Sequence, residues 1–163
     1  MGIRYHAYAF DADQTERALA DPRSVLSDDP LADAWGTPNG AVTACTDFRR
    51  SVPEGDMLHL DTAWSALQTL TAPRSPGQPP RPAHRMVEGR VTVRGMGWDP
   101  CVRAVPPDEV AEIADDLIAL RAEVEEQLAE HPEGEYARQC LDRAVEFTTE
   151  VARSGRGFAY LIG

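Results

Sequence analysis

The residues of this chain best suited to acid–base or ligand chemistry lie between positions 56 and 64. Asp56, His59 and Asp61 stand at spacings of three and two, and Trp64 follows them. A histidine beside carboxylates can act as a general base or belong to a metal site. The spacing fits no standard ligand motif, and the structural alternative is that Asp61 caps a helix while His59 lies on a strand. Together with Arg85 these residues form our candidate binding set; we name no catalytic residue, metal ligand or cofactor.

A second candidate lies near the N-terminus. Tyr8-Ala9-Phe10-Asp11-Ala12-Asp13-Gln14-Thr15 resembles the first motif of haloacid-dehalogenase-type phosphatases. The resemblance implies a magnesium-dependent phosphohydrolase with Asp11 as nucleophile and Asp13 as acid/base. That family also needs a later acidic pair and a parallel sheet, which this sequence does not indicate. The alternative is a strand-to-helix corner where one aspartate is a cap.

Other residue types exclude or restrict further chemistry. All 16 basic residues are arginine, so a lysine Schiff base and a lysine-containing phosphate loop are excluded. His6, His84 and His131 are isolated in the sequence and are expected to be solvated or hydrogen-bonded residues. Three cysteines, Cys45, Cys101 and Cys140, are far apart, and we expect reduced, mostly buried thiols of a cytoplasmic protein.

The net charge of −11 is concentrated in one part of the chain. Positions 108–150 hold 14 acidic residues and three arginines, and the remainder is neutral. Such a segment repels phosphate backbones, so we expect no nucleic-acid binding. It is either a solvated helix face or a docking face for a basic protein partner. No apolar run approaches the ~20 residues of a membrane span, so we also expect no membrane partner.

Local patterns in the first half predict mostly short elements. Ile3–Phe10 reads as a strand, and a short helix capped by Asp11 or Asp13 follows it to about Ala20. Residues 21–56 are irregular, with helical turns expected around Arg23–Leu26 and Leu31–Trp35. A helix is predicted from Asp61 to about Leu70. The proline-rich stretch 73–82 is predicted to be an extended surface loop.

The second half has stronger periodicity. Residues 87–94 suggest a strand with a break at Gly89, a turn spans 95–100, and 101–105 suggest another strand. From Pro107, apolar residues recur at spacings of three and four to Leu128, which predicts an amphipathic helix. A second helix is expected from about Tyr136 to Val151, forming a helical hairpin with the first. Phe158–Ile162 is predicted to be a closing strand within the sheet.

These elements predict a single α+β domain over residues 1–163. We expect a small mixed or antiparallel sheet with amphipathic helices on one face, including the C-terminal helical hairpin and the final strand. The oligomeric state is not readable from the sequence.

Three stretches also resemble one known family. Leu58-His59-Leu60-Asp61-Thr62-Ala63-Trp64-Ser65-Ala66-Leu67 resembles the Leu-Asp-Lys-x-Trp-x-x-Leu motif of the YfbM-like bacterial proteins, a domain of unknown function. Residues 102–110 and 156–162 resemble that family's strand-to-helix junction and terminal strand. Thr62 replaces the usual lysine, and Pro106 replaces the capping serine or threonine. The resemblance implies a small cytoplasmic bacterial protein with an α+β fold, and it implies no activity.

The acidic hairpin and the incomplete catalytic sets favour one function over the others. We expect a non-enzymatic binding module that recruits a basic protein through its acidic helical face. The alternatives are the phosphohydrolase centred on Asp11 and Asp13, and a small-molecule-binding protein that uses Asp56, His59, Asp61, Trp64 and Arg85.

Overall fold

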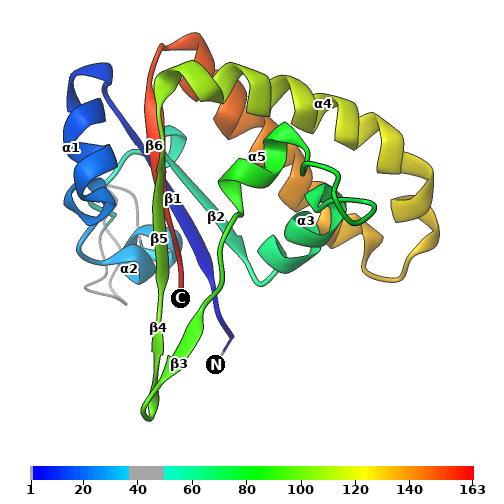
Figure 1. The fold of residues 1–163 in the computed structure, drawn as a ribbon, viewed down its shortest axis with the longest axis horizontal. Helices are drawn as coiled ribbons and strands as arrows, with labels where there is room; N and C mark the ends of the chain where they lie inside the picture. Colours follow the sequence, from blue (N-terminus) through cyan, green and yellow to red (C-terminus); the bar gives the residue numbers. More distant parts are fainter. Residues whose placement is uncertain (1, 37–49) are drawn as a thin grey trace.

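The computed structural model describes residues 2–36 and 50–163. Its centre is a four-stranded sheet in which neighbouring strands all run antiparallel (Figure 1). In their order across the sheet, the strands are β2 (Met57–Asp61), β1 (Tyr5–Phe10), β6 (Gly157–Ile162) and β5 (Cys101–Val105). The last strand of the chain is therefore an inner strand, and the predicted closing strand is confirmed.

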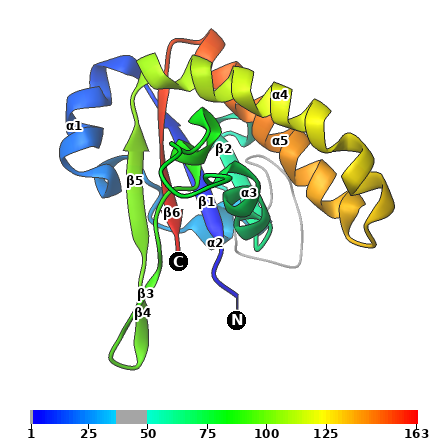
Figure 2. The ribbon, with the colours of Figure 1, turned by 45° about the vertical axis from the view of Figure 1, so that its right-hand side comes forward.

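Two long helices cover one face of this sheet as a hairpin (Figures 1 and 2). They are α4 (Pro107–Glu130) and α5 (Gly134–Arg153), as the periodicity predicted. Pro107 occupies the first position of α4, where its missing N–H costs no intrahelical bond. The connection requires a glycine at 134, because a Cβ there would collide with the Leu128 carbonyl oxygen. Within the described ranges, no helix has an apolar stretch long enough to cross a membrane.

The main core lies between this hairpin and the sheet. Alternate residues of each strand point toward the helices, because side chains alternate across a strand. Tyr5 of β1 stacks on Tyr160 of β6 with ring centroids 5.5 Å apart, and Phe158 meets Phe147 of α5 at 5.6 Å. The apolar stripe of α4 completes the layer through five buried side chains: Val110, Ile113, Leu117, Leu120 and Val124. The α+β fold class is confirmed.

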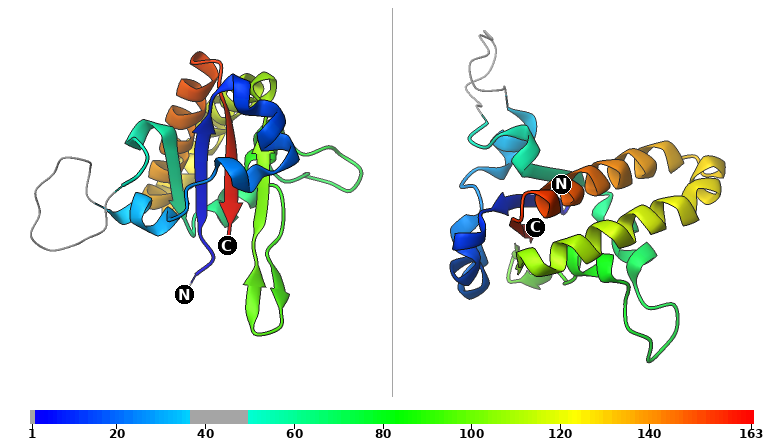
Figure 3. Two further views of the ribbon diagram at one scale, coloured as in Figure 1. Left: turned by 90° about the vertical axis from the view of Figure 1, so that its left-hand side faces the viewer. Right: turned by 90° about the horizontal axis from the view of Figure 1, so that it is seen from above.

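Short helices cover the opposite face of the sheet (Figure 3). They are η1 (Ala12–Gln14), α1 (Thr15–Ala20), η2 (Pro22–Val25) and α2 (Pro30–Trp35), which confirms the predicted N-terminal helix and helical turns. Asp11 begins η1, and its N–H donates to the Gln14 side chain at 3.2 Å. A smaller core forms here around Phe10, Ala18, Ala104 and Ala159.

The helix after β2 begins later than predicted. It is α3 (Trp64–Thr71), and Ala63 holds the N-cap position, so the prediction that Asp61 caps it is wrong. Asp61 instead ends β2 with a φ of 48°, a left-handed conformation that aspartate tolerates better than most residues. Its carboxylate lies 3.3 Å from Arg4 Nε. The chain turns at Asp61 before the helix can start.

The strand predicted over 87–94 is only half present. The proline-rich segment leads into η4 (Pro82–Met86), Val87 is buried after it, and β3 covers only Thr92–Arg94. Gly89 has a φ of 127° and lies against Cys101, so the chain breaks at the glycine where a break was expected. The Gln68 amide donates to the Val87 and Gly89 carbonyls at 2.6 and 2.9 Å and holds this segment. Residues 73–81 have no regular structure, as predicted.

The turn predicted over 95–100 is shorter than expected. Only Gly95 and Met96 turn, and β4 (Gly97–Asp99) pairs with β3 as a two-stranded ribbon. Gly95 has a φ of 64°, as the first central residue of a type II′ hairpin turn requires. After Pro100 the chain enters β5, so the ribbon projects beyond the sheet at its β5 edge (Figures 1 and 2).

Candidate functional site

The five residues predicted as a binding set have separate partners. Arg156 donates to Asp56 at 2.8 Å, and Trp64 Nε1 donates to the Ile3 carbonyl at 3.0 Å. Arg85 donates to Glu109 at 2.9 Å and to Glu88 at 3.0 Å. Asp61 pairs with Arg4. Within the described structure, no hydrogen bond or ion pair joins any two of the five residues. Their role as a common site stays a prediction.

His59 is the member of that set with an unexpected partner. Its Nδ1 lies 3.2 Å from Nδ1 of His6, which is 5% exposed on the neighbouring strand. His6 is thus hydrogen-bonded, one of the two states expected for it, because the β1–β2 register places the two imidazoles opposite each other. A short Nδ1–Nδ1 contact requires one ring to donate a proton and the other to accept it, so the two rings cannot both be charged.

The surroundings of the pair favour the neutral form of both rings. Burial, followed by the nearby His59 and Arg4, lowers the pKa of His6 to about 4. Burial also lowers the pKa of His59, and Asp61 only partly opposes that effect. The indole ring of Trp35 meets the His59 ring edge-on at 5.8 Å. The imidazole pair thus lies between the sheet and α2.

A buried carboxylate fixes α2 next to this pair. Asp33 is 1% exposed and accepts the Tyr8 hydroxyl at 3.1 Å, the Ser51 N–H at 2.7 Å and the Ser51 hydroxyl at 2.9 Å. Burial alone would raise the pKa of Asp33, but hydrogen bonding by Ser27, Ser51 and Tyr8 outweighs it and the pKa falls. The carboxylate therefore stays ionised and ties α2, β1 and Ser51 together.

These two networks form part of the wall of a groove along β2. The groove has a volume of about 1020 Å³ and runs between the end of α2 and the outer side of α5. Met57, Leu58 and His59 form its floor, and β2 is paired on only one side in the described part of the chain. Trp35 is 65% exposed and Ile118 of α4 is 50% exposed, so both offer apolar surface there.

The groove carries an excess of negative charge. Five carboxylates line it, against two guanidinium groups. The acids are Asp33, Glu54, Asp142, Glu146 and Glu150, and the bases are Arg50 and Arg143. Glu54, Asp142 and Glu150 each have an arginine partner, whereas Glu146 and Arg143 have no ion-pair partner among residues 2–36 and 50–163. The groove thus combines an unpaired strand edge, apolar anchors and free carboxylate.

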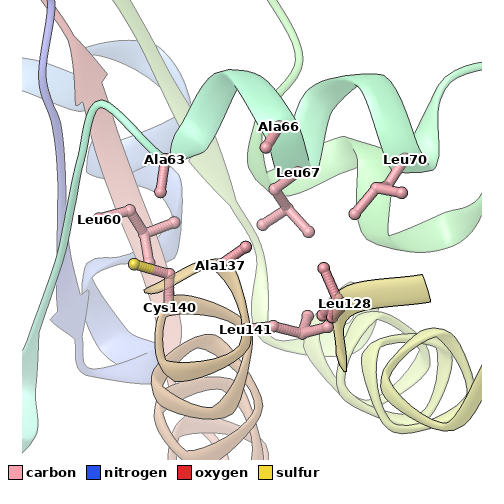
Figure 4. Close-up of a pocket in the computed structure, with 9 residues that line it drawn as sticks. All are labelled: Leu60, Ala63, Ala66, Leu67, Leu70, Leu128, Ala137, Cys140 and Leu141. Carbon is pink, nitrogen blue, oxygen red and sulfur yellow. The ribbon is translucent and has the colours of Figure 1, made fainter. Parts of the chain in front are cut away.

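A second, smaller pocket lies between α3, α4 and α5 (Figure 4). Its volume is about 20 Å³, far below the ~300 Å³ of small ligand sites. Eight of its nine lining residues are alanine or leucine, and the ninth is Cys140, which is buried and free as predicted. This pocket is a packing gap and not a ligand site. Cys101 is also free, and Cys45 lies outside the described residues.

Asp11 and Asp13 lie at a different place in the fold. Both are exposed at the start of η1, and β1, which precedes them, runs antiparallel to both neighbours. The described sheet is therefore not the parallel sheet that accompanies this motif in the phosphatase family. No group of three His, Cys, Asp or Glu residues in the described part of the chain is placed to hold a metal ion.

Comparisons with known proteins add no further identification. No protein-family model matches the chain, and no curated protein or solved structure matches it. The YfbM-like resemblance stays a prediction. Sequence reasoning missed the pairing of His6 with His59 and the role of Asp33. The one available signal was the position of His6 and Tyr8 on the same side of a predicted strand.

Proposed function

We propose that this protein is a binding module that takes an extended, basic segment of a protein partner in the groove along β2. The observation that carries the proposal is the coincidence of acidic and apolar walls with a strand edge that is unpaired among residues 2–36 and 50–163. An added strand pairs its backbone with such an edge, and its alternate side chains meet the two walls.

The charge of the groove favours a basic segment. It continues the acidic surface of the α4–α5 hairpin, where seven of the 14 acids have no ion-pair partner in the described structure. These seven are Asp108, Glu112, Asp115, Glu126, Glu130, Glu133 and Glu146. Their field attracts positive charge and accelerates encounter with a basic partner.

The apolar residues of the groove supply the remaining interaction. Exposed tryptophan is the residue type most often found at the energetic centre of an interface. The ring of Trp35 packs against His59, and the hydrogen bonds of Asp33 fix the position of α2, which carries the tryptophan. A pre-ordered tryptophan loses little entropy on binding. No comparable observation favours the phosphohydrolase or the small-molecule alternative.

A short peptide in which arginine alternates with valine is a suitable probe. We expect saturable binding by calorimetry, weakened at least about tenfold by Glu146→Arg, because the substitution places like charges together. Glu126→Arg is the matched control: Glu126 is also exposed and without an ion-pair partner among the described residues, but it does not line the groove. Equal affinity of the two variants, or no saturable binding to the unaltered protein, would contradict the proposal.

A further inference from the structure

The β3–β4 ribbon carries three highly exposed apolar side chains outside the groove. Val93 and Trp98 lie directly opposite each other in the ribbon register and are 70% and 61% exposed. Met96 at the turn is also fully exposed. Because Val93 and Trp98 share one face of the ribbon, they form an apolar surface that projects into solvent. Isolated two-stranded ribbons are marginally stable in water, so such a projection gains from being covered.

The ribbon also carries positive charge. Arg90 precedes β3 and Arg94 ends it, and neither has a carboxylate partner among the described residues. The nearest acid along the ribbon is Asp99, which pairs with Thr92 in the register. The ribbon therefore combines exposed apolar side chains, arginines and outer strand edges that are unpaired in the described structure. These are the features that the groove along β2 is proposed to bind.

We propose that the segment bound in this groove is the β3–β4 ribbon of a second copy of this chain. This inference rests on the proposed function and names its partner. In the contact, a ribbon edge would pair with β2, Trp98 would pack near Trp35 and Ile118, and Arg94 would face Glu146. The attraction is local, between two complementary patches of a chain whose net charge is −11.

The positions of ribbon and groove determine the kind of assembly. The ribbon extends from β5 and the groove follows β2, which are the two opposite edges of the sheet (Figure 1). Each copy therefore offers a ribbon at one edge and a groove at the other. Contacts between unlike surfaces are heterologous and join copies head to tail in an open chain or a ring.

The test is complementation between two variants, followed by sedimentation velocity. We expect the unaltered protein to form assemblies that grow with concentration. Trp98→Ser removes the ribbon anchor and Glu146→Arg blocks the groove, and each variant alone is expected to be monomeric. Mixed in equal amounts, they should form a one-to-one dimer and nothing larger, because only one intact ribbon and one intact groove remain. Trp98→Ser should weaken association at least about tenfold.

Two further variants keep the result interpretable if Trp98→Ser disturbs folding. Arg94→Glu changes only an exposed charge and should also prevent assembly, and combining it with Glu146→Arg in one chain should restore assembly by exchanging the charges. Glu126→Arg should assemble normally. Assembly of Glu146→Arg alone would overturn the proposal, since it would show ribbon-to-ribbon contact. A monomer at all concentrations also overturns it. If the arginine–valine peptide still binds that monomer, the proposed function stands without it.

Discussion

Tyr5 and Tyr160 are buried and stack on each other, but their hydroxyl groups have different surroundings. The Tyr160 hydroxyl lies 2.9 Å from the Arg85 carbonyl and 2.8 Å from the Glu88 carbonyl, so it has acceptors. The Tyr5 hydroxyl is buried without a hydrogen-bond partner in the described structure. A buried polar group without a partner costs free energy, whereas a satisfied one stabilises.

Phenylalanine substitutions should therefore have opposite effects. We expect Tyr160→Phe to lower the free energy of unfolding by about 1–2 kcal/mol, because the hydrogen bond from the hydroxyl to these backbone carbonyls is lost. Tyr5→Phe should leave it unchanged or raise it. Urea denaturation of both variants measures the difference, and an equal loss in the two would show that the Tyr5 hydroxyl has a partner.

The imidazole pair makes stability depend on pH. The pKa of His6 is about 4 in the folded protein, below its ordinary value of about 6.5. The unfolded chain therefore binds a proton at a higher pH than the folded chain does. The stabilisation is complete above about pH 6.5 and is lost as the pH falls toward 4.

His6→Gln should reduce this dependence. We expect the loss of unfolding free energy between pH 7 and pH 4 to be smaller by up to about 3 kcal/mol in the variant. Glutamine can still donate and accept a hydrogen bond, so the comparison isolates the proton. His131→Gln removes an exposed imidazole instead and is the control. Identical pH profiles for His6→Gln and the unaltered protein would contradict a neutral pair.

Ion pairs contribute to the arrangement of elements according to their burial. Arg81, at the end of the proline-rich loop, donates to Asp116 of α4 at 2.8 and 3.0 Å and to Glu123 at 2.7 Å. The side chains of Arg81 and Asp116 are 18% and 14% exposed. Asp116 also accepts the Ala83 N–H at 2.9 Å. This cluster attaches the loop and η4 to the helical hairpin.

Removing the arginine leaves that buried carboxylate without its counter-ion. We expect Arg81→Met to lower the free energy of unfolding by about 2–4 kcal/mol. Arg153→Met removes a pair with Glu150 on the surface of α5, where the arginine is 73% exposed, and should cost much less because solvent screens such a pair. Thermal denaturation distinguishes the two, and similar losses would mean that burial does not decide the contribution.

Across the whole molecule, the acidic residues that are concentrated in one segment of the sequence also lie together on one part of the surface. The segment with 14 acids is almost entirely the α4–α5 hairpin, whose apolar stripes face the sheet. Because the sheet occupies the inner faces, the carboxylates lie outside, and those of α5 extend to the groove. The exposed ribbon projects from the other edge of the sheet (Figure 2). Within one copy, the acidic groove at β2 and the ribbon at β5 therefore lie at opposite edges of the sheet.

The elements that could be predicted from sequence are those whose signal is local and repeated. The stripe of α4 extends over several turns, and alternative structures cannot bury it as well. The helix before position 70 was placed three residues early because an aspartate before an apolar run looks like a cap. Asp61 belongs to the preceding strand, where its ion pair with Arg4 and its left-handed backbone decide its role.

The amino-acid sequence alone determined the helical hairpin, the inner C-terminal strand and the acidic surface, because each follows from composition and periodicity within a continuous segment. Only the tertiary structure decided that His6 meets His59, that Asp33 is buried under Tyr8 and Ser51, and that β2 lies at an edge of the sheet formed by the described residues. These contacts join residues 18 to 53 positions apart. They depend on strand order and register, which no local pattern specifies.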